Sequence, residues 1–447
     1  MKNLKVVDPW IFDLIKQEEK RQEDVLEMIP SENYASPAVM EALGSVLTNK
    51  YSEGYAKKRY YQGNKFIDSV EILAMERAKK LFGVAHVNVQ PYSGSPANTA
   101  VYFALLQPKD KIMGLSLAFG GHLTHGSPVS FSGKYFTIVS YELDKNGYLD
   151  YGAIEKLALK EKPKIIVCGA TAYPRIIDFK RFGEIADKVG AYLLADISHI
   201  TGLIIAGAHP SPAPHVHIIM TTTHKTLRGP RGAMLMVTQK GLKKDPELGD
   251  KIDKAVFPGL QGGPHDNQTA AIAVALLEAS KASFKKYGQQ IVKNAKVLAD
   301  ELASFDFNLI SGGTDNHLLL IDLSNKKVNG AVAALALEVA GIVVNKNAVP
   351  EDTLPPFYPS GIRLGTPAIT TRGMKEKEMV KIGKWINEVI SEVSNQVLPN
   401  DNGFDKLTIK EKRKEFWRRF RVDVIKNKKL LKIAKEVKYL CQKFPLP

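Results

Sequence analysis

Short apolar runs alternate with helix-length segments between about residues 50 and 275. Three such runs are almost wholly apolar: Lys164–Cys168, Ala191–Ala195 and Val216–Met220. Strands of a parallel sheet are covered by helices on both faces, so they are apolar throughout rather than at alternate positions. The pattern therefore predicts an α/β fold with a mostly parallel sheet.

The pattern differs at the two ends of the chain. Asp8-Pro9 predicts the start of a helix, and the stretch from Trp10 to Ile29 has apolar ends and a charged middle, as an arm lying across another surface would. After an Ala-rich helical run at Thr269–Ala279, helices and short strands suggest a smaller α+β domain. We expect an N-terminal helical arm at residues 1–50, a large domain at 51–278 and a small C-terminal domain at 279–447.

Composition limits the class of protein. With 44% hydrophobic and 24% charged residues among 447, the chain has a globular composition with ample material for a core. It has no apolar run of the roughly 18–20 residues that span a bilayer, and its start lacks the apolar stretch of a signal peptide. Two cysteines are too few for a disulfide framework or a Cys-built zinc site. We therefore expect a soluble, cytoplasmic protein.

The net charge of +15 is concentrated in a tail. From Asp405 to Lys443, 15 Lys and Arg residues face 5 Asp and Glu residues. Leu430, Val437 and Cys441 belong to an apolar stripe at helical spacing, so we expect a basic helical tail at about 405–447. Its basic surface can be a solvated face, or it can attract polyanions such as RNA or polyglutamylated folate.

The segment Thr221–Gly232, TTTHKTLRGPRG, follows an apolar run. Open parallel sheets bind ligands at the carboxyl ends of their strands, so Lys225 can face a cofactor carbonyl there. A partly desolvated amine beside cationic neighbours can lose its proton and form a Schiff base. The alternative is a solvated loop lysine, which fits poorly beside hydroxyls, His224 and two arginines.

Asp196 ends a second apolar run. A buried carboxylate requires a cationic partner, and the protonated pyridine nitrogen of pyridoxal phosphate is one. The alternative is a capping Asp at a strand end. Because Asp196 and Lys225 both close apolar runs, the pair favours a cofactor site.

Two further segments carry candidate binding groups. Ser93-Gly94-Ser95 leads into a helix, whose N-terminus can bind a phosphate, although most such turns are only caps. His122 and His125 lie in a Gly-rich loop. They could bind a metal, but no carboxylate or Cys lies nearby in the sequence to complete the site. Stacking of His122 on an aromatic cofactor is the better functional interpretation, and a plain loop histidine is the alternative.

Two segments favour a small-molecule substrate. Asn49–Gly63 is dense in Tyr, Lys and Gly, and its one carboxylate, Glu53, favours a small-molecule site over a basic aromatic patch for nucleic acid. Arg363 lies between apolar residues in a strand-like run, where its guanidinium can bind a substrate carboxylate or form an internal salt bridge.

Together these motifs resemble the serine hydroxymethyltransferase family, in the aspartate-aminotransferase-like class of pyridoxal phosphate enzymes. The motifs run in order and cover nearly the whole chain: Ser31–Tyr34, Leu47–Tyr55, Lys58–Gly63, Gly120–Val129, Thr221–Gly232, Val256–Pro264, Ser311–His317, Val344–Pro350 and Ser360–Ala368.

The resemblance implies a role for individual residues. Lys225 would bind the cofactor aldehyde, Asp196 the pyridine nitrogen, and His122 would stack on the ring. The cofactor would also be bound by Ser93, Gly94, Ser95, Thr171 and His199, and by Tyr51, Gly262 and Gly263 of a second subunit. Catalysis would involve Lys225, Glu53, His122, Tyr61, Thr223 and His224. Serine would contact Ser31, Glu53, Tyr61 and Arg363, and the pterin would contact Leu117, Gly121, Leu123 and Asn347. No metal is implied.

The implied reaction is the reversible transfer of the hydroxymethyl group of L-serine to tetrahydrofolate, giving glycine and 5,10-methylenetetrahydrofolate. The cofactor would be pyridoxal phosphate, with tetrahydrofolate or a related pterin as co-substrate. A shared site makes a homodimer the minimum unit, and dimers could pair into a tetramer. The alternative enzyme is a folate-independent threonine or phenylserine aldolase. A nucleic-acid-binding role is prompted by the tail, but the near-neutral body argues against it as the main function.

Overall fold

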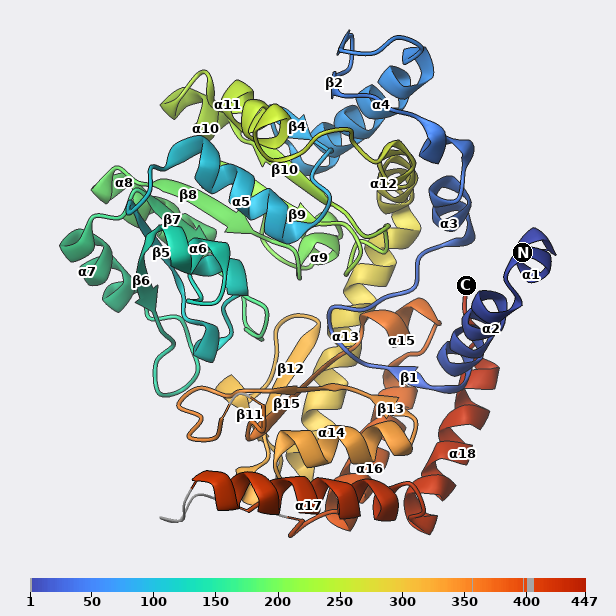
Figure 1. Ribbon diagram of the computed structural model, residues 1–447. Helices are drawn as coiled ribbons and strands as arrows, with labels where there is room; N and C mark the ends of the chain where they lie inside the picture. Colours follow the sequence, from blue (N-terminus) through green and yellow to red (C-terminus); the bar gives the residue numbers. More distant parts are fainter. Residues whose placement is uncertain (1, 356, 397, 400–405) are drawn as a thin grey trace. The chain divides into compact units, whose positions relative to one another are not determined.

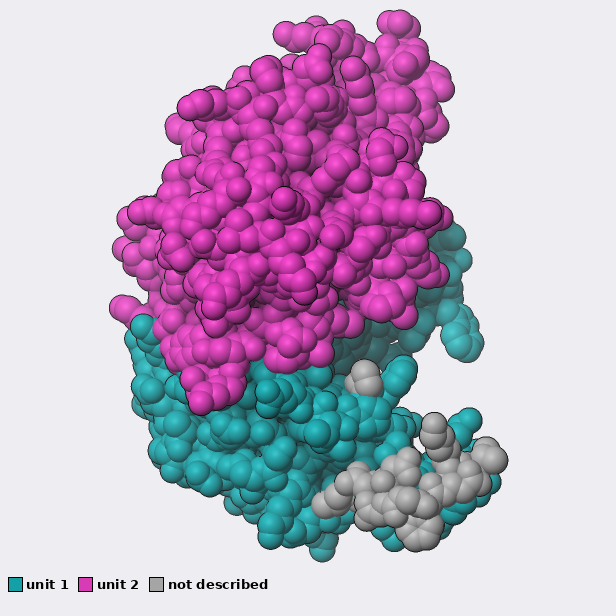
Figure 2. All heavy atoms as spheres, turned by 90° about the vertical axis from the view of Figure 1, so that its left-hand side faces the viewer, with its two compact units in different colours: residues 1–29, 294–313, 319–447 teal, residues 30–293, 314–318 magenta. Residues whose placement is uncertain are grey.

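The computed structural model of the protein describes residues 2–355, 357–396, 398–399 and 406–447 (Figure 1). Its contacts define two compact units, coloured in Figure 2. Unit 1 comprises Met1–Ile29, Asn294–Gly313 and Leu319–Pro447, and unit 2 comprises Pro30–Lys293 and Thr314–Leu318. The predicted domain boundaries at residues 50 and 278 stay predictions.

Unit 2 is built on a seven-stranded sheet with the order β4-β10-β9-β8-β7-β5-β6. Its strands are β4 (His86–Asn88), β5 (Lys111–Leu115), β6 (Thr137–Tyr141), β7 (Ile165–Cys168), β8 (Tyr192–Asp196), β9 (Ile218–Thr222) and β10 (Ala233–Val237). Strands β6, β5, β7, β8 and β9 pair in parallel, while β10 is antiparallel to both β9 and β4. The predicted mostly parallel α/β sheet is confirmed.

Helices cover both faces of this sheet, as Figure 1 shows. The helices of unit 2 are α3 (Pro37–Leu43), α4 (Lys65–Phe82), α5 (Gly94–Leu105), α6 (Phe131–Tyr135), α7 (Tyr151–Glu161), α8 (Phe179–Val189), α9 (Thr201–Ile205), α10 (Gln239–Lys244), α11 (Leu248–Lys254), α12 (Asp266–Ala279) and the first part of α13 (Ala282–Ser304). A short hairpin, β2 (Gly54–Tyr55) with β3 (Lys58–Arg59), precedes α4.

Successive residues of the central strands belong to two different cores. Ile166 packs in a core with α4, α7 and α8, whereas its neighbours Ile165 and Val167 pack in another core with α5 and α11. Side chains of a strand alternate between the two faces of a sheet, so a strand with a core on each side must be apolar throughout. This is the physical reason for the continuous apolar runs in the sequence.

Unit 1 is an α+β unit around a four-stranded sheet with the order β11-β12-β15-β14. Its strands are β11 (Asn308–Leu309), β12 (Leu318–Asp322), β14 (Asn345–Asn347) and β15 (Gly361–Gly365), and β1 (Leu26–Glu27) pairs separately with β13 (Ile342–Val343). Its helices are α1 (Lys2–Val7), α2 (Pro9–Asp24), the second part of α13, α14 (Gly330–Val339), α15 (Pro367–Thr371), α16 (Glu376–Glu392), α17 (Lys406–Val424) and α18 (Lys428–Lys443).

The two ends of the chain meet within unit 1. Helix α2 begins where the sequence predicts, because the Asp8 carboxylate accepts a hydrogen bond from the Ile11 amide at 3.0 Å. Arg372 donates hydrogen bonds to backbone carbonyls of Gln22, Val25 and Cys441, so one buried guanidinium ties α2 to α18. The last helices therefore form part of a packed unit.

Both cysteines are buried. Cys168 ends β7 in unit 2, and Cys441 lies on α18 in unit 1. Burial raises the pKa of the Cys168 thiol far above its usual range and raises that of Cys441 to about 11. None of the helices in the described part of the chain combines the length and hydropathy that a membrane span requires.

Candidate functional site

A buried pocket lies at the carboxyl ends of the parallel strands of unit 2. Strands β7, β8 and β9 end side by side there, so residues that are far apart in the sequence meet at one edge of the sheet. The pocket is lined by Gly94, His122, His125, Ala170, Thr171, Asp196, Ser198, His199, Met220, Thr222 and Lys225. Six of the predicted site residues are thus brought together: Gly94, His122, Thr171, Asp196, His199 and Lys225.

Lys225 is buried, three residues after the end of β9. Its backbone carbonyl accepts hydrogen bonds from the Asn33 side chain and the Arg228 amide, both at 3.0 Å. Thr223 donates its hydroxyl to the Pro230 carbonyl at 2.6 Å, which closes the loop after β9. Hydrogen bonds therefore hold the backbone on both sides of Lys225, which fixes the position from which its side chain extends. Thr223 itself is engaged in the loop and does not line the pocket.

Asp196 is buried at the end of β8, and hydrogen-bond donors contact both of its carboxylate oxygens. Its Oδ2 lies 3.0 Å from Asn98 Nδ2 and 3.1 Å from His125 Nε2, and its Oδ1 accepts from the Ser198 amide at 3.1 Å. Burial alone would raise the pKa of this carboxyl, but the hydrogen bonds from His125 and Ser198 hold the pKa well below its usual range. Asp196 is therefore an ionised carboxylate at neutral pH.

His122 and His224 are neutral at neutral pH. Burial lowers the pKa of His122 to about 4, and burial together with Arg231 and Lys225 lowers that of His224 to about 3. The Nδ1 atom of His122 accepts from the Thr124 amide at 3.2 Å and lies 2.7 Å from the Thr124 hydroxyl, which fixes the ring at the pocket wall. His224 lies next to Lys225 in sequence but is not part of the pocket lining.

The N-terminus of α5 brings further polar groups to the pocket. Ser93 is the N-cap of α5, yet its side chain makes no capping hydrogen bond. A Cβ atom on Gly94 would lie 2.8 Å from Thr222 Cγ2, so a glycine is needed for this approach of helix to strand. The hydroxyl of Thr222 and the Oδ1 of Asn98 are buried without a hydrogen-bond partner in the described part of the chain. Ser95 is exposed at the same helix start.

These features fit pyridoxal phosphate. An ionised, buried carboxylate matches a pyridinium nitrogen, an amine after the neighbouring strand matches an aldehyde, and the amides at a helix start with the unpartnered Thr222 hydroxyl match a phosphate. The residues present therefore suit the cofactor that the sequence predicts.

A second group of predicted site residues gathers outside this pocket, on the surface of unit 2. The Tyr51 hydroxyl donates to Glu53 Oε1 at 3.2 Å, and the rings of Tyr51 and Tyr61 lie edge to face at 5.1 Å. A Cβ on Gly262 would lie 3.0 Å from Glu53 Oε1, and one on Gly263 would lie 3.5 Å from the Tyr51 ring. Tyr51 and Tyr61 are 56% and 47% exposed, so this aromatic and carboxylate cluster faces outward.

The predicted pterin residues of unit 2 lie on a tight loop after β5. Leu117 and Leu123 are exposed, whereas Gly121 is buried between them. A Cβ on Gly121 would lie 1.9 Å from the Leu115 carbonyl oxygen, so only glycine fits. The Thr171 hydroxyl lies 3.1 Å from the carbonyl of Gly120, which joins this loop to the pocket wall.

The remaining predicted site residues, Arg363, Asn347 and Ser31, do not all belong to the same unit. In unit 1, Arg363 is buried in β15, and its Nε donates to Asn345 Oδ1 at 3.0 Å. Burial lowers the pKa of its guanidinium to about 10. Asn347 is half-buried in the neighbouring strand β14, and Ser31 is half-buried in unit 2.

The sequence prediction missed Asn98 and Thr222, and it named His125 beside His122 without its partner, because no carboxylate lies near the two histidines in the sequence. Asp196, remote in sequence, places its carboxylate with both rings, and one ligand atom of each residue lies within 4.8 Å of the others. We assign no metal there, because the carboxylate oxygens already accept hydrogen bonds. A polar Asn98 on the apolar side of α5 was the one sequence signal for the missing contacts.

Comparisons with known proteins show which family the chain belongs to. Residues 4–386 match the model of a protein family described as serine hydroxymethyltransferase. The chain is 55% identical over 447 residues to a serine hydroxymethyltransferase of Desulfotalea psychrophila, covering 100% of this chain and 96% of that protein. It is 58% identical over 392 residues to a serine hydroxymethyltransferase of Acidothermus cellulolyticus, covering 88% and 90% of the two chains.

Proposed function

Because the chain belongs to the serine hydroxymethyltransferase family, we propose that the buried pocket of unit 2 is where the family's reaction takes place. That reaction is the reversible transfer of the hydroxymethyl group of L-serine to tetrahydrofolate, which gives glycine and 5,10-methylenetetrahydrofolate. The observation that carries the proposal is that Lys225, the ionised Asp196 and the neutral His122 line one pocket.

Each cofactor-binding residue has a distinct task. Lys225 would hold the cofactor through its aldehyde, Asp196 would pair with its pyridine nitrogen, and the flat His122 ring would contact its aromatic ring. Pyridoxal phosphate, when bound, accepts the electron pair that remains on the amino acid when a bond to its α-carbon breaks. Asp196 supports this because a permanent negative charge keeps the pyridine nitrogen protonated. Ser93, Gly94 and Ser95 bind the phosphate, and Thr171 and His199 lie towards the phenolic oxygen.

Arg363 would bind the carboxylate of serine, and Ser31 is a further predicted contact of this substrate. A guanidinium in a buried strand is the natural partner of a planar carboxylate, because two parallel N–H donors match its two oxygens. The neutral Asn345 side chain orients the guanidinium without neutralising it. Leu117, Gly121, Leu123 and Asn347 contact the pterin of tetrahydrofolate.

The surface cluster of unit 2 acts in the site of a second subunit. Glu53 moves the proton between serine, the one-carbon unit and the folate, while Tyr61 lies beside it, and Tyr51, Gly262 and Gly263 approach the phosphate. Two observations support a homodimer. The cluster is exposed although it holds reactive groups, and Val6, Val7 and Trp10 on the N-terminal helices are each about 80% exposed. Pairing of dimers into tetramers and the cytoplasmic location stay predictions.

The experiment measures serine cleavage by the purified enzyme with and without tetrahydrofolate, together with its absorbance spectrum. We expect a cofactor absorbance band only as long as Lys225 is present, and a cleavage rate that rises strongly on adding the folate. Lys225→Ala should lose the band and multiple turnover, whereas Lys243→Ala, which changes an exposed lysine of the same unit, should keep both. Equal cleavage rates with and without folate would favour the aldolase instead.

A further inference from the structure

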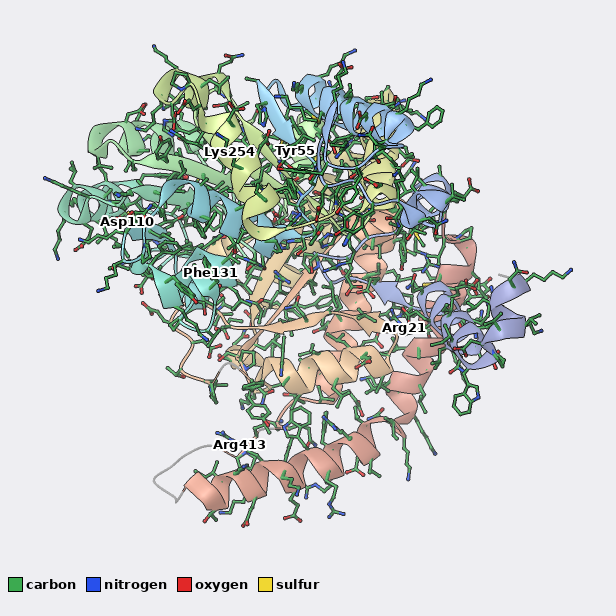
Figure 3. The ribbon with its side chains drawn as sticks, turned by 45° about the horizontal axis from the view of Figure 1, so that its top comes forward. Arg21, Tyr55, Asp110, Phe131, Lys254 and Arg413 are labelled. Atoms are coloured by element: carbon green, nitrogen blue, oxygen red, sulfur yellow. The ribbon has the colours of Figure 1, made fainter. Side chains whose placement is uncertain are left out.

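A groove of about 900 Å³ runs along helix α17 of unit 1, and none of its lining residues is assigned to the reaction. It is lined by Tyr358, Ile409, Lys410, Arg413, Lys414, Trp417, Arg418 and Arg421. Seven of these lie on α17 at spacings of one, three and four residues, so they share one face of the helix. Figure 3 labels Arg413 on this helix.

The helix that bears the groove is docked on unit 1 by apolar residues beside the groove. Phe416, Phe420 and Val424 of α17 are buried in the core of unit 1. The rings of Phe416 and Phe420 stack at 5.7 Å. The basic face is therefore presented by a docked helix, and charge changes on it leave the apolar contacts in place.

Five cations of the groove have no carboxylate within ion-pair distance among the residues that the structure describes: Lys410, Arg413, Lys414, Arg418 and Arg421. Helix α2 is different, because its Lys16, Lys20 and Arg21 all pair with acidic side chains. The acidic groups nearest in sequence, Glu411 and Glu415, lie outside the groove lining, and Glu338 lines an adjoining recess. The groove is thus a strip of uncompensated positive charge.

Two aromatic rings form a platform within this strip. Trp417 stacks on Tyr358 with ring centroids 6.0 Å apart and planes at 23°. The Arg413 guanidinium lies 5.6 Å from the Tyr358 ring, and that of Arg421 lies 5.8 Å from the Trp417 ring. The indole N–H of Trp417 is buried and has no hydrogen-bond partner in the described part of the chain.

We propose that this groove binds single-stranded nucleic acid. Cations that follow a phosphate backbone and an aromatic pair on which a base stacks are the two components of such sites. From Ile409 to Arg421 the helix is about 18 Å long, enough for a few phosphates of an extended strand. An acidic polypeptide would pair with the cations but has no bases to stack on the aromatic rings. In a duplex the bases stack on one another and are not free to stack on these rings.

The test measures binding of a fluorescein-labelled 12-nucleotide oligouridylate to the full-length holoenzyme by fluorescence anisotropy. With four or five phosphate contacts, the logarithm of the affinity should fall against the logarithm of the salt concentration with a slope of about −3. The triple variant Lys410→Glu, Lys414→Glu, Arg418→Glu should weaken binding about tenfold or more at 50 mM salt and lower the slope. Oligothymidylate in a parallel titration distinguishes DNA from RNA.

The matched control is Lys426→Glu, Lys428→Glu, Lys435→Glu, which makes the same change in net charge at exposed positions outside the groove. It should leave affinity nearly unchanged, and serine cleavage should be normal in both triple variants. In a Trp10→Phe background, binding should quench the fluorescence of Trp417, because the third tryptophan, Trp385, is buried. Equal losses in both triple variants, equal affinity for poly-L-glutamate or a duplex of the same charge, or unchanged tryptophan fluorescence would each overturn the proposal.

Discussion

The Nδ1 atom of His199 lies 3.3 Å from the Nε2 atom of His317, and both rings are buried in unit 2. His317 comes from Thr314–Leu318, a segment of unit 2 whose neighbours in the chain belong to unit 1. The segment is anchored by the Asn316 side chain on the Tyr173 carbonyl at 3.0 Å and by an Arg175–Asp315 ion pair at 2.9 Å. One of the two facing nitrogens donates and the other accepts, so the tautomers of the two rings depend on each other.

His317→Leu should therefore lower both stability and activity. Losing a buried hydrogen bond of this kind costs about 1–3 kcal/mol in the free energy of unfolding, measured by urea denaturation. Because His199 lines the pocket, we also expect a shifted cofactor absorbance. His317→Gln, which keeps a polar group at similar reach, should recover part of both losses; equal losses in the two variants would mean that packing alone matters.

The buried histidines predict a loss of stability in mild acid. For His122 the pKa is about 4 in the folded protein against an ordinary value of 6.5, so the unfolded chain binds more protons between these pH values. Its contribution is fully present above pH 6.5 and declines as the pH falls towards 4. Between pH 7 and pH 5 this amounts to about 2 kcal/mol. Urea denaturation of the cofactor-free protein should show this decline, and His122→Phe should reduce it by a similar amount.

The shared site predicts complementation between two inactive variants. Glu53→Gln should lower folate-dependent serine cleavage about 10²–10⁴-fold with the cofactor still bound, because an amide keeps the shape but cannot transfer a proton. When it is mixed with Lys225→Ala and the subunits are allowed to exchange, heterodimers contain one site with both residues intact. Activity should then return to about a quarter of the wild-type value. No recovery after proven exchange would place Glu53 in the site of its own chain.

Gly121 predicts a steric effect on the loop after β5. Its Cβ in Gly121→Ala would overlap the Leu115 carbonyl oxygen, which belongs to a rigid strand. We expect a loss of about 3 kcal/mol in the free energy of unfolding and a weakened dependence of the rate on folate. Gly44→Ala, where the nearest atom lies at 3.5 Å, should be close to neutral. A large loss in that variant as well would show a general intolerance of alanine rather than a local clash.

Those features of the fold that depend on local pattern could be predicted from the sequence. The apolar runs identified β7, β8 and β9, and the rule for parallel sheets placed Asp196 and Lys225 at the same edge. Contacts set by tertiary packing could not be predicted, because Asn98 and His125 meet Asp196 across 98 and 71 positions of the chain. The placement of His317 in unit 2 has the same origin, since nothing in its local sequence marks the change of unit.

The two buried cysteines give each unit one chemical probe of its own. Cys168 reports on unit 2 and Cys441 on unit 1, and a thiol in a closed core is shielded from an alkylating reagent. Alkylation during a brief pulse therefore labels a unit only while it is open, and peptide masses tell the two events apart. The natural sequence thus allows the opening of each unit to be timed separately, without introducing any foreign label.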